Sequence, residues 1–258
     1  MRLWNGSPKA VNWWRDDRCA KAFWSQHEMP AYQELLADTL SWLEPRPGQH
    51  WIDLGCGAGR LCRAIWAKSN GMVATITGLD CAALNAQSFQ KMSLNLQPTP
   101  GERLRFELVD FSTGLPWHGE NLFDGAVSGL AIQYAESWSA SENRWTTTAF
   151  DQLLQDVHRV LKPGSAFVFS MNVPEPSWGT VALGALRGVL SSRRKVRYLM
   201  KLWGMWRYGG WLKREARTGR FHYLPVDVIT RKLTEAGFRS SEYRLSFARQ
   251  AFLFRAYK

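Results

Sequence analysis

The sequence feature that most constrains this chain is a glycine-rich turn that joins an apolar strand pattern to a helical one. Residues 50–61 read HWIDLGCGAGRL, so a short apolar run reaches Asp53 and is followed by Gly55, Gly57 and Gly59. Glycine lets a ligand approach the backbone closely, and the first turn of a helix presents free N–H groups. This arrangement favours a nucleoside-type ligand at the carboxyl end of a parallel sheet.

The spacing within this turn separates two classes of cofactor. The dinucleotide fingerprint is GxGxxG, whereas this run is GxGxG, with Arg60 where the third dinucleotide glycine would stand. Asp53, two residues before the first glycine, would repel a pyrophosphate but attract a cofactor that carries an ammonium group. The GxxxxGK[ST] phosphate-binding run is absent from the sequence, which argues against a nucleoside triphosphatase. The alternative is a tight strand-to-helix turn that binds nothing.

Short apolar runs alternate with helical patterns through the middle of the chain. We expect strands at 50–54, 74–79, 104–109, 123–128 and 166–171, with helices at 31–43, 60–68, 81–95 and 147–161. A Lys-Pro-Gly turn at 162–164 is expected to end the last of these helices. The alternation predicts an α/β fold with a mostly parallel sheet. A helix from Pro225 to about Ala236 and strand-like runs at 241–247 and 251–257 predict a C-terminal antiparallel hairpin.

Acidic residues also stand at the ends of the next two expected strands. Asp80 comes 21 residues after Gly59, at a place where an acid can accept both hydroxyls of a ribose. Asp110 and Phe111 end the third strand, and an acid beside an aromatic ring suits an adenine. Taken alone, each of these acids is typical of a solvated turn residue. Three acids at three successive strand ends instead predict a single ligand site.

Together these features resemble the class I S-adenosylmethionine-dependent methyltransferases, in particular the small-molecule branch that includes the quinone C-methyltransferases. The resemblance covers residues 48–176 and extends to the AGF run at 236–238; within it lie FDGAVSGLAIQY at 123–134 and HRVLKPG at 158–164. It implies a Rossmann-like sheet of seven mostly parallel strands with helices on both faces, a C-terminal antiparallel hairpin and a helical lid. It also implies S-adenosylmethionine as cofactor, S-adenosylhomocysteine as product, and no metal.

The resemblance assigns the cofactor-binding residues. Asp53 and the glycine turn would hold the methionine part, Asp80 the ribose, and Asp110 with Phe111 the adenine. The complete predicted set is Asp53, Gly55, Cys56, Gly57, Gly59, Asp80, Cys81, Asp110, Phe111, Gly129 and Leu130. Because the reaction is an in-line transfer of a sulfonium methyl group, positioning does most of the work, and a base is needed only if the acceptor must lose a proton.

The methyl acceptor is predicted by exclusion. The run at 128–131 is SGLA rather than the [DN]PP[YF] of amino-nitrogen methyltransferases, and the sequence lacks the Pro-Cys dipeptide of the cytosine C5 enzymes. In the family that the sequence resembles, the N-terminal helices and the segment after the fifth strand build the acceptor site, and here both are rich in aromatic residues, so we expect a small aromatic or lipophilic acceptor. Trp13, Trp24 and Trp178 are candidates for its pocket. His222, Tyr134 and Tyr223 are the candidate catalytic groups, with His222 favoured as a base.

The positive charge of the chain, +11 in total, is confined to its last third. Residues 1–176 hold 15 Lys and Arg against 18 Asp and Glu, whereas residues 177–258 hold 18 against 4. The basic, Trp-containing segment 181–220 suits an anionic membrane surface, a nucleic acid or solvent alone. Two rival functions follow. One is an RNA or other polyanion methyltransferase that uses this segment. The other is a non-catalytic methyltransferase-like module that binds a membrane or a partner.

We expect a single methyltransferase domain. Its parts are a helical cap at 1–44, a cofactor-binding core at 45–176, a basic aromatic lid at 177–222 and a segment at 223–258 that completes the sheet. The four cysteines form no CxxC pair, which argues against a zinc framework. The N-terminus lacks the apolar run of a signal peptide, and no apolar stretch is long enough to cross a bilayer. We therefore predict a cytoplasmic protein, at most peripheral to the inner face of the membrane.

Overall fold

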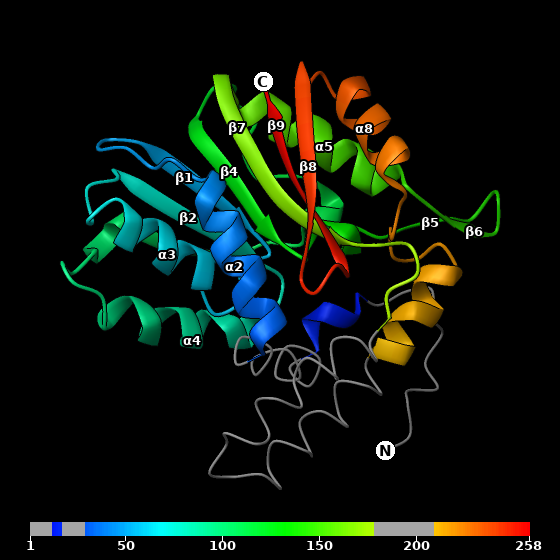
Figure 1. The fold of residues 1–258 in the computed structure, drawn as a ribbon, viewed down its shortest axis with the longest axis horizontal. Coiled ribbons are helices and arrows are strands. Elements are labelled where there is room, and N and C mark those ends of the chain that lie inside the picture. The colour runs from blue at the N-terminus through cyan, green and yellow to red at the C-terminus, as the bar shows by residue number, and fades with distance from the viewer. Residues whose placement is uncertain (1–11, 17–28, 178–208) are drawn as a thin grey trace, which may run out of the picture.

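The computed structural model describes residues 12–16, 29–177 and 209–258 and places one seven-stranded sheet at the centre of the molecule (Figure 1). The strand order is β3-β2-β1-β4-β7-β9-β8. The strands are β1 (His50–Leu54), β2 (Thr75–Asp80), β3 (Leu104–Leu108), β4 (Phe123–Gly129), β7 (Leu161–Asn172), β8 (Ser240–Ser246) and β9 (Ala251–Tyr257). Strands β1 to β4 and β7 are mutually parallel, whereas β9 is antiparallel to β7 and β8. The predicted fold class is confirmed.

Helices cover both faces of this sheet (Figure 1). One face packs against α2 (Pro30–Trp42), α3 (Arg60–Lys68) and α4 (Ala83–Leu94). The other face packs against α5 (Thr148–Val160) and α8 (Val226–Glu235). The predicted helices form because their apolar residues recur at helical spacing and bury one side, as Phe150, Leu153, Leu154, Val157 and Val160 do in α5.

Local signals also set where the helices begin and end. Pro30 opens α2 at its first position, where its missing N–H leaves no hydrogen bond unmade. Pro225 precedes α8, and Gly237 follows it with a φ of +102°, a left-handed conformation that glycine adopts readily. These boundaries agree with the sequence expectations to within about two residues.

Two parts of the fold differ from the sequence expectations. Strand β7 begins at Leu161, so the Lys-Pro-Gly run at 162–164 lies inside the strand instead of forming a separate turn. The β4 register shifts between Phe123 and Gly125 opposite this irregular start. A small hairpin of β5 (Ser137–Ser139) and β6 (Arg144–Thr146) was not expected, because three-residue strands carry no readable alternation.

The predicted lid is described only at its C-terminal end. Residues 209–217 are helical and lead through a turn to Phe221 and His222. The larger part of the basic segment 181–220, residues 181–208, lies outside the described residues. No helix within the described ranges is long and apolar enough to cross a membrane. The described residues also contain four short 3-10 turns: η1 (Trp13–Arg15), η3 (Gly101–Arg103), η4 (Phe111–Thr113) and η5 (Ile132–Tyr134).

Candidate cofactor and acceptor site

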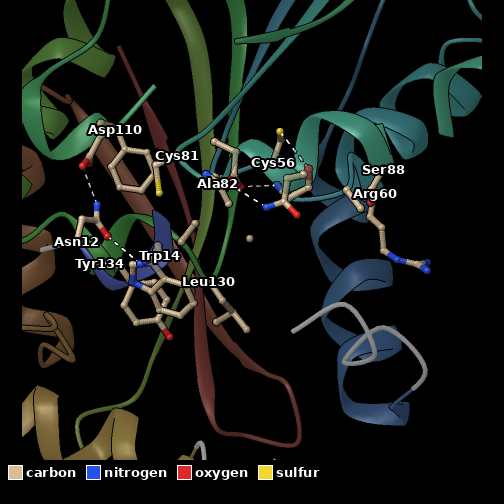
Figure 2. Close-up of a pocket in the computed structure, with 18 of the residues that line it drawn as sticks. Asn12, Trp14, Cys56, Arg60, Cys81, Ala82, Ser88, Asp110, Leu130 and Tyr134 are labelled. Carbon is tan, nitrogen blue, oxygen red and sulfur yellow. Dashed lines mark hydrogen bonds between the residues drawn. The ribbon is translucent and has the colours of Figure 1, made fainter. Parts of the chain in front are cut away.

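A pocket of about 370 Å³ opens at the carboxyl ends of the parallel strands. Its wall is made by the glycine turn after β1, by the ends of β2, β3, β4 and β7, by the β8–β9 turn and by η1 (Figure 2). Of the predicted cofactor residues, those that line it are Gly55, Cys56, Gly57, Asp80, Cys81, Asp110, Phe111, Gly129 and Leu130. The structure therefore gathers into one cavity residues that lie up to 75 positions apart in the sequence.

The glycine turn has the shape that a close-approaching ligand requires. All three glycines have positive φ, +73° at Gly55, +52° at Gly57 and +81° at Gly59. A Cβ at Gly55 would lie 2.2 Å from the Ala131 Cβ, so this position must be glycine for the chain to pack. Gly57 lines the pocket and a Cβ there would meet no atom within 4 Å. Gly55 is thus a packing requirement, whereas Gly57 leaves room beside the backbone for a ligand.

Asp80 joins the glycine turn to the start of α4. Its carboxylate accepts hydrogen bonds from the Gly57 N–H at 2.8 Å, the Ala82 N–H at 2.9 Å and the Asn85 side-chain amide at 3.0 Å. Burial raises the pKa of Asp80, and these hydrogen bonds lower it. The carboxylate is consequently held in a fixed orientation at the pocket wall.

Asp53 lies on the α3 face of β1, behind the glycine turn rather than in the pocket lining. It is 1% exposed, and its Oδ2 accepts a hydrogen bond from the Cys62 thiol at 3.1 Å. Its Oδ1 is buried and has no hydrogen-bond partner within the described parts of the chain. Burial raises the pKa of Asp53 to about 7, the hydrogen bond from Cys62 lowers it, and nearby Asp80 raises it. The unsatisfied oxygen is a hydrogen-bond acceptor available to a cationic ligand, whose charge would favour the ionised form of the carboxyl.

Asp110 is shared between the pocket and the N-terminal turn. Its Oδ2 accepts a hydrogen bond from the Asn12 side-chain amide at 2.7 Å (Figure 2). The same oxygen accepts from Arg15 at 3.1 Å, and Oδ1 caps η4 through the Ser112 N–H. Asn12 also accepts from the Trp14 N–H, so the turn is braced on both sides. Sequence reasoning missed Asn12, because no local signal links residues 98 positions apart.

The opposite side of the pocket is apolar and aromatic. Leu130 has a φ of +53°, an uncommon value for a leucine, and its N–H is held by the Ser170 hydroxyl at 2.9 Å. The Trp14 ring lies against the Tyr134 ring with centroids 4.3 Å apart (Figure 2). Leu212 and Phe247 complete this side. A strained backbone conformation such as that of Leu130 is common at ligand-binding sites.

The three candidate catalytic groups are placed differently from one another. Tyr134 lines the pocket, and its hydroxyl lies 3.3 Å from the Tyr223 hydroxyl. Burial raises the pKa of Tyr134 to about 12 and raises that of Tyr223 still more strongly. Both phenols therefore keep their protons at neutral pH, which does not suit a general base.

His222 does not reach the pocket, contrary to the role favoured from sequence. It is 2% exposed, its Nε2 donates to the Ala135 carbonyl at 2.8 Å, and burial lowers its pKa to about 4. Its side chain and that of Tyr223 line a second cavity, beside β6 and the end of the 209–217 helix. The backbone N–H of His222 also donates to the Gln133 carbonyl, so this residue anchors the C-terminal end of the lid to η5.

Of the three tryptophans proposed for the acceptor pocket, the structure describes only Trp13, and this residue does not line the pocket. Trp13 packs against Trp211 with centroids 5.5 Å apart and lies under the Arg220 guanidinium, outside the pocket. Trp24 and Trp178 lie outside the described residues. The adjacent Trp14 lines the pocket instead, together with Tyr32, Asn172, Leu212 and Phe247, none of which the sequence patterns indicated. Within the described ranges, no cluster of three or more His, Cys, Asp or Glu could hold a metal ion.

An open parallel sheet with a glycine turn and an acid-lined pocket at its carboxyl edge defines a Rossmann-like enzyme that binds a nucleoside-type cofactor. A family model described as a methyltransferase domain matches residues 45–194, more than half of the sequence. The chain therefore belongs to this family and contains a methyltransferase domain.

Similar proteins agree with this assignment. The chain is 29% identical over 137 residues to 24-methylenesterol C-methyltransferase 3 of Arabidopsis thaliana, covering 53% of this chain and 32% of that protein. It is 26% identical over 127 residues to 2-phytyl-1,4-naphtoquinone methyltransferase of a Nostoc strain, covering 49% and 48%. The chain thus spans about a third to a half of the length of these curated relatives. An S-adenosylmethionine-dependent methyltransferase from Mesorhizobium loti shares the fold, with a TM-score of 0.54 at 20% identity over 86% of this chain and 96% of that one.

The site residues fit the cofactor of this family. S-adenosylmethionine carries an ammonium group and a sulfonium group, and the acids Asp80 and Asp110 line the pocket. Asp53 lies outside the pocket lining, with one carboxyl oxygen that has no partner among the described residues. The acid-lined side of the pocket consequently matches the positive charge of the cofactor.

Proposed function

We propose that this methyltransferase acts on a small, lipophilic acceptor that contains a ring. The observation that carries the proposal is the division of the pocket into two chemically different halves. Acidic residues stand at the ends of β2 and β3, whereas the side over β4, β7 and the β8–β9 turn is apolar and aromatic, formed by Trp14, Leu130, Tyr134, Leu212 and Phe247. A pocket with an apolar half and few polar groups suits a compact hydrophobic ligand.

The named activities of the relatives support this proposal. One is a sterol C-methyltransferase and another a naphthoquinone methyltransferase, and both names describe ring-containing lipophilic acceptors. A polyanion such as RNA would instead require a basic surface at the pocket mouth. The described residues that line the pocket include one basic side chain, Arg60, against Asp80 and Asp110.

The acid-lined half would hold the cofactor. Asp80 would accept the ribose hydroxyls, Asp110 and Phe111 would flank the adenine, and Asp53 with the glycine turn would hold the methionine part. Cys56, Cys81, Gly129 and Leu130 would shape the remaining wall, whereas Gly59 packs against Met92 and Phe89 and lies outside the pocket lining. When bound, S-adenosylmethionine supplies an electrophilic methyl group. The chain contributes charge complementarity and orientation, the two terms that matter most for an in-line transfer.

The aromatic half would orient the acceptor. Because Tyr134 keeps its proton at neutral pH, its hydroxyl would donate a hydrogen bond rather than remove a proton. We infer that the acceptor atom arrives as a competent nucleophile or loses its proton to solvent. The Trp14 ring lies against Tyr134 at a tilt of 40° and would exclude water from this side.

The cap and the lid would close the pocket within a single domain. Trp13 of η1 meets Trp211 of the 209–217 helix, so the two flanking segments touch where the structure describes both. We propose that the segments 1–44 and 177–222 together cover the acceptor, and that the core at 45–176 with the segment 223–258 forms the sheet. The basic part of the lid could lie on an anionic membrane surface from which a lipophilic acceptor is delivered.

A methyl-transfer assay with competing acceptors tests the proposal. The purified chain is incubated with S-adenosylmethionine carrying a tritiated methyl group and with 2-phytyl-1,4-naphthoquinol, a sterol, a catechol or total RNA. We expect label in an organic-extractable product. The matched variants are Asp80→Ala, which should lose transfer, and Glu235→Gln on the exposed end of α8, which should not. Label in RNA alone would overturn the acceptor class, and calorimetry without cofactor binding would favour a non-catalytic module.

A further inference from the structure

A buried polar cluster lies beneath the apolar half of the pocket, between η5 and the end of β7. The Asn172 N–H donates to Gln133 Oε1 at 2.6 Å, and Gln133 Nε2 donates to the Leu130 carbonyl at 3.2 Å. Gln133 is fully buried, so both ends of its side-chain amide are used within the protein. The hydroxyls of Tyr134 and Tyr223 form a second pair in the same cluster.

Asn172 differs from the other members of this cluster. It lines the pocket and is 2% exposed, yet its Oδ1 has no hydrogen-bond partner among the residues that the structure describes. Burial raises the pKa of both Tyr134 and Tyr223, and hydrogen bonding by the Asn172 side chain lowers it. The side-chain carbonyl oxygen of Asn172 is the atom that is left without a partner among the described residues.

The position of Asn172 assigns this oxygen to the acceptor rather than to the cofactor. In the sheet, β7 is separated from β2 by β1 and β4. Three steps of about 4.8 Å place the end of β7 roughly 14 Å from Asp80. One polar group of a ligand cannot bridge both ends of that span. A buried carbonyl oxygen without a donor is rare in native proteins, which points to a ligand that supplies one.

We propose that Asn172 is a specificity-determining residue that accepts a hydrogen bond from a hydroxyl group on the lipophilic ring acceptor. The proposal rests on the proposed function, because it takes the apolar half of the pocket as the acceptor site. The ligand class is therefore a hydroxylated ring, and a hydrocarbon or an ether of the same shape lacks the donor that Asn172 requires. Trp14, Leu130 and Phe247 supply the apolar surface around that single polar contact.

Two matched probes test this proposal by binding alone. 2-Naphthol carries the donor, whereas 2-methoxynaphthalene has the same ring without it. Each is titrated calorimetrically into the wild-type chain, with and without saturating S-adenosylhomocysteine. We expect the naphthol to bind about tenfold or more tightly than the ether, since binding the ether leaves a buried acceptor unpaired. Equal affinities for the two probes would overturn the proposal.

Variants at Asn172 test whether this residue causes the preference for 2-naphthol over the ether. Asn172→Leu should lose the preference for the naphthol, leaving the two probes within about threefold, because leucine cannot accept a hydrogen bond. Asn172→Asp keeps an acceptor oxygen and should retain at least a tenfold preference. The same Asn→Leu change at Asn95, an exposed residue that caps α4, is the control and should leave both affinities unchanged. A preference that survives in Asn172→Leu, or is lost in Asn172→Asp, would also overturn the proposal.

The two proposals fail in different ways. Wild-type chain that binds S-adenosylhomocysteine but shows no preference for the hydroxyl contradicts the role of Asn172 alone. Chain that prefers the naphthol but does not bind S-adenosylhomocysteine contradicts the proposed function and leaves Asn172 as a site for hydroxylated rings.

Discussion

The Asn12 side-chain amide donates a hydrogen bond of 2.7 Å to Asp110, the acid that ends the β3 side of the pocket. Arg15 adds an ion pair to the same carboxylate at 3.1 Å. The residue proposed to flank the adenine is therefore also the anchor of the N-terminal turn. As a result, Trp14 is held over Tyr134 by the same acid that faces the cofactor.

Removing this anchor should weaken cofactor binding without removing a cofactor-binding acid. We expect Asn12→Ala to lower the affinity for S-adenosylhomocysteine about three- to tenfold, because the turn no longer braces Asp110. Calorimetry measures the affinity, and fluorescence should report a changed environment of Trp14. Asn95→Ala on α4 serves as the control. An unchanged affinity in Asn12→Ala would show that the turn and the cofactor half are independent.

Asp80 should be the most sensitive position of the cofactor half. We expect Asp80→Asn to reduce the affinity for S-adenosylhomocysteine about 10- to 100-fold, since hydrogen bonds to a carboxylate are roughly twice as strong as neutral ones. The amide keeps the size of the side chain, so Gly57 and Asn85 retain a neighbour. Glu235→Gln is the matched control for loss of one negative charge. A fall of less than about threefold would argue against ribose binding at Asp80.

The buried Asp53 should make stability depend on pH. Its pKa of about 7 in the folded chain lies above its ordinary value of 3.8, mainly because of burial. The folded state then holds a proton that the unfolded state has lost, so stability is full below about pH 4 and is lost as the pH rises through about 7. We expect the wild-type free energy of unfolding, without cofactor, to fall across this window relative to that of Asp53→Asn.

Urea unfolding of both proteins at about pH 5 and about pH 8 checks this expectation. The difference between the two proteins should grow in favour of Asp53→Asn at the higher pH. Parallel pH profiles would mean that Asp53 ionises normally in the folded chain. Saturating S-adenosylhomocysteine should reduce the difference if its ammonium group faces Asp53.

Arg220 should be essential for the stability of the C-terminal end of the lid. Its guanidinium is 1% exposed, is paired with Glu136, and lies over the rings of Trp13 and Trp145. Removing one partner of such a pair leaves a buried charge, so we expect Arg220→Met to lower the free energy of unfolding by about 3–5 kcal/mol. The double variant with Glu136→Met should recover most of this loss. Additive losses in the double variant would contradict a coupled buried pair.

The β8–β9 turn offers a stabilising change. Arg249 is exposed and has a φ of +63°, next to two further non-glycine residues with positive φ, Phe247 and Ala248. Arg249→Gly should stabilise the chain by about 0.5–1 kcal/mol in urea unfolding, because glycine adopts this conformation without strain. Arg249→Ala removes the same side chain but keeps the Cβ, and should change stability by less than about 0.5 kcal/mol. Equal effects of the two variants would assign the gain to the side chain.

The cofactor half of the site could be predicted because its signals are local. Gly55, Gly57 and Gly59 mark the turn, and Asp80 and Asp110 follow readable strands. Parallel strands bring their carboxyl ends to one edge, so residues at these ends must converge once the α/β alternation is recognised. Most strands of the main sheet, the helices and the C-terminal hairpin were predictable for the same reason, since periodicity and turn chemistry act over a few residues.

The acceptor half was decided by tertiary structure. Asn12 meets Asp110 across 98 positions, and Asn172 meets Gln133 across 39, with no sequence pattern to join either pair. His222 looked like a neutral-pH base in the sequence, but packing buried it and lowered its pKa to about 4. The sequence by itself determined the sheet, the glycine turn and the acids at its edge, because these follow from local conformational preference. Only the packing of distant segments decided which side chains face the cavity and which are desolvated, because burial is a property of the whole fold.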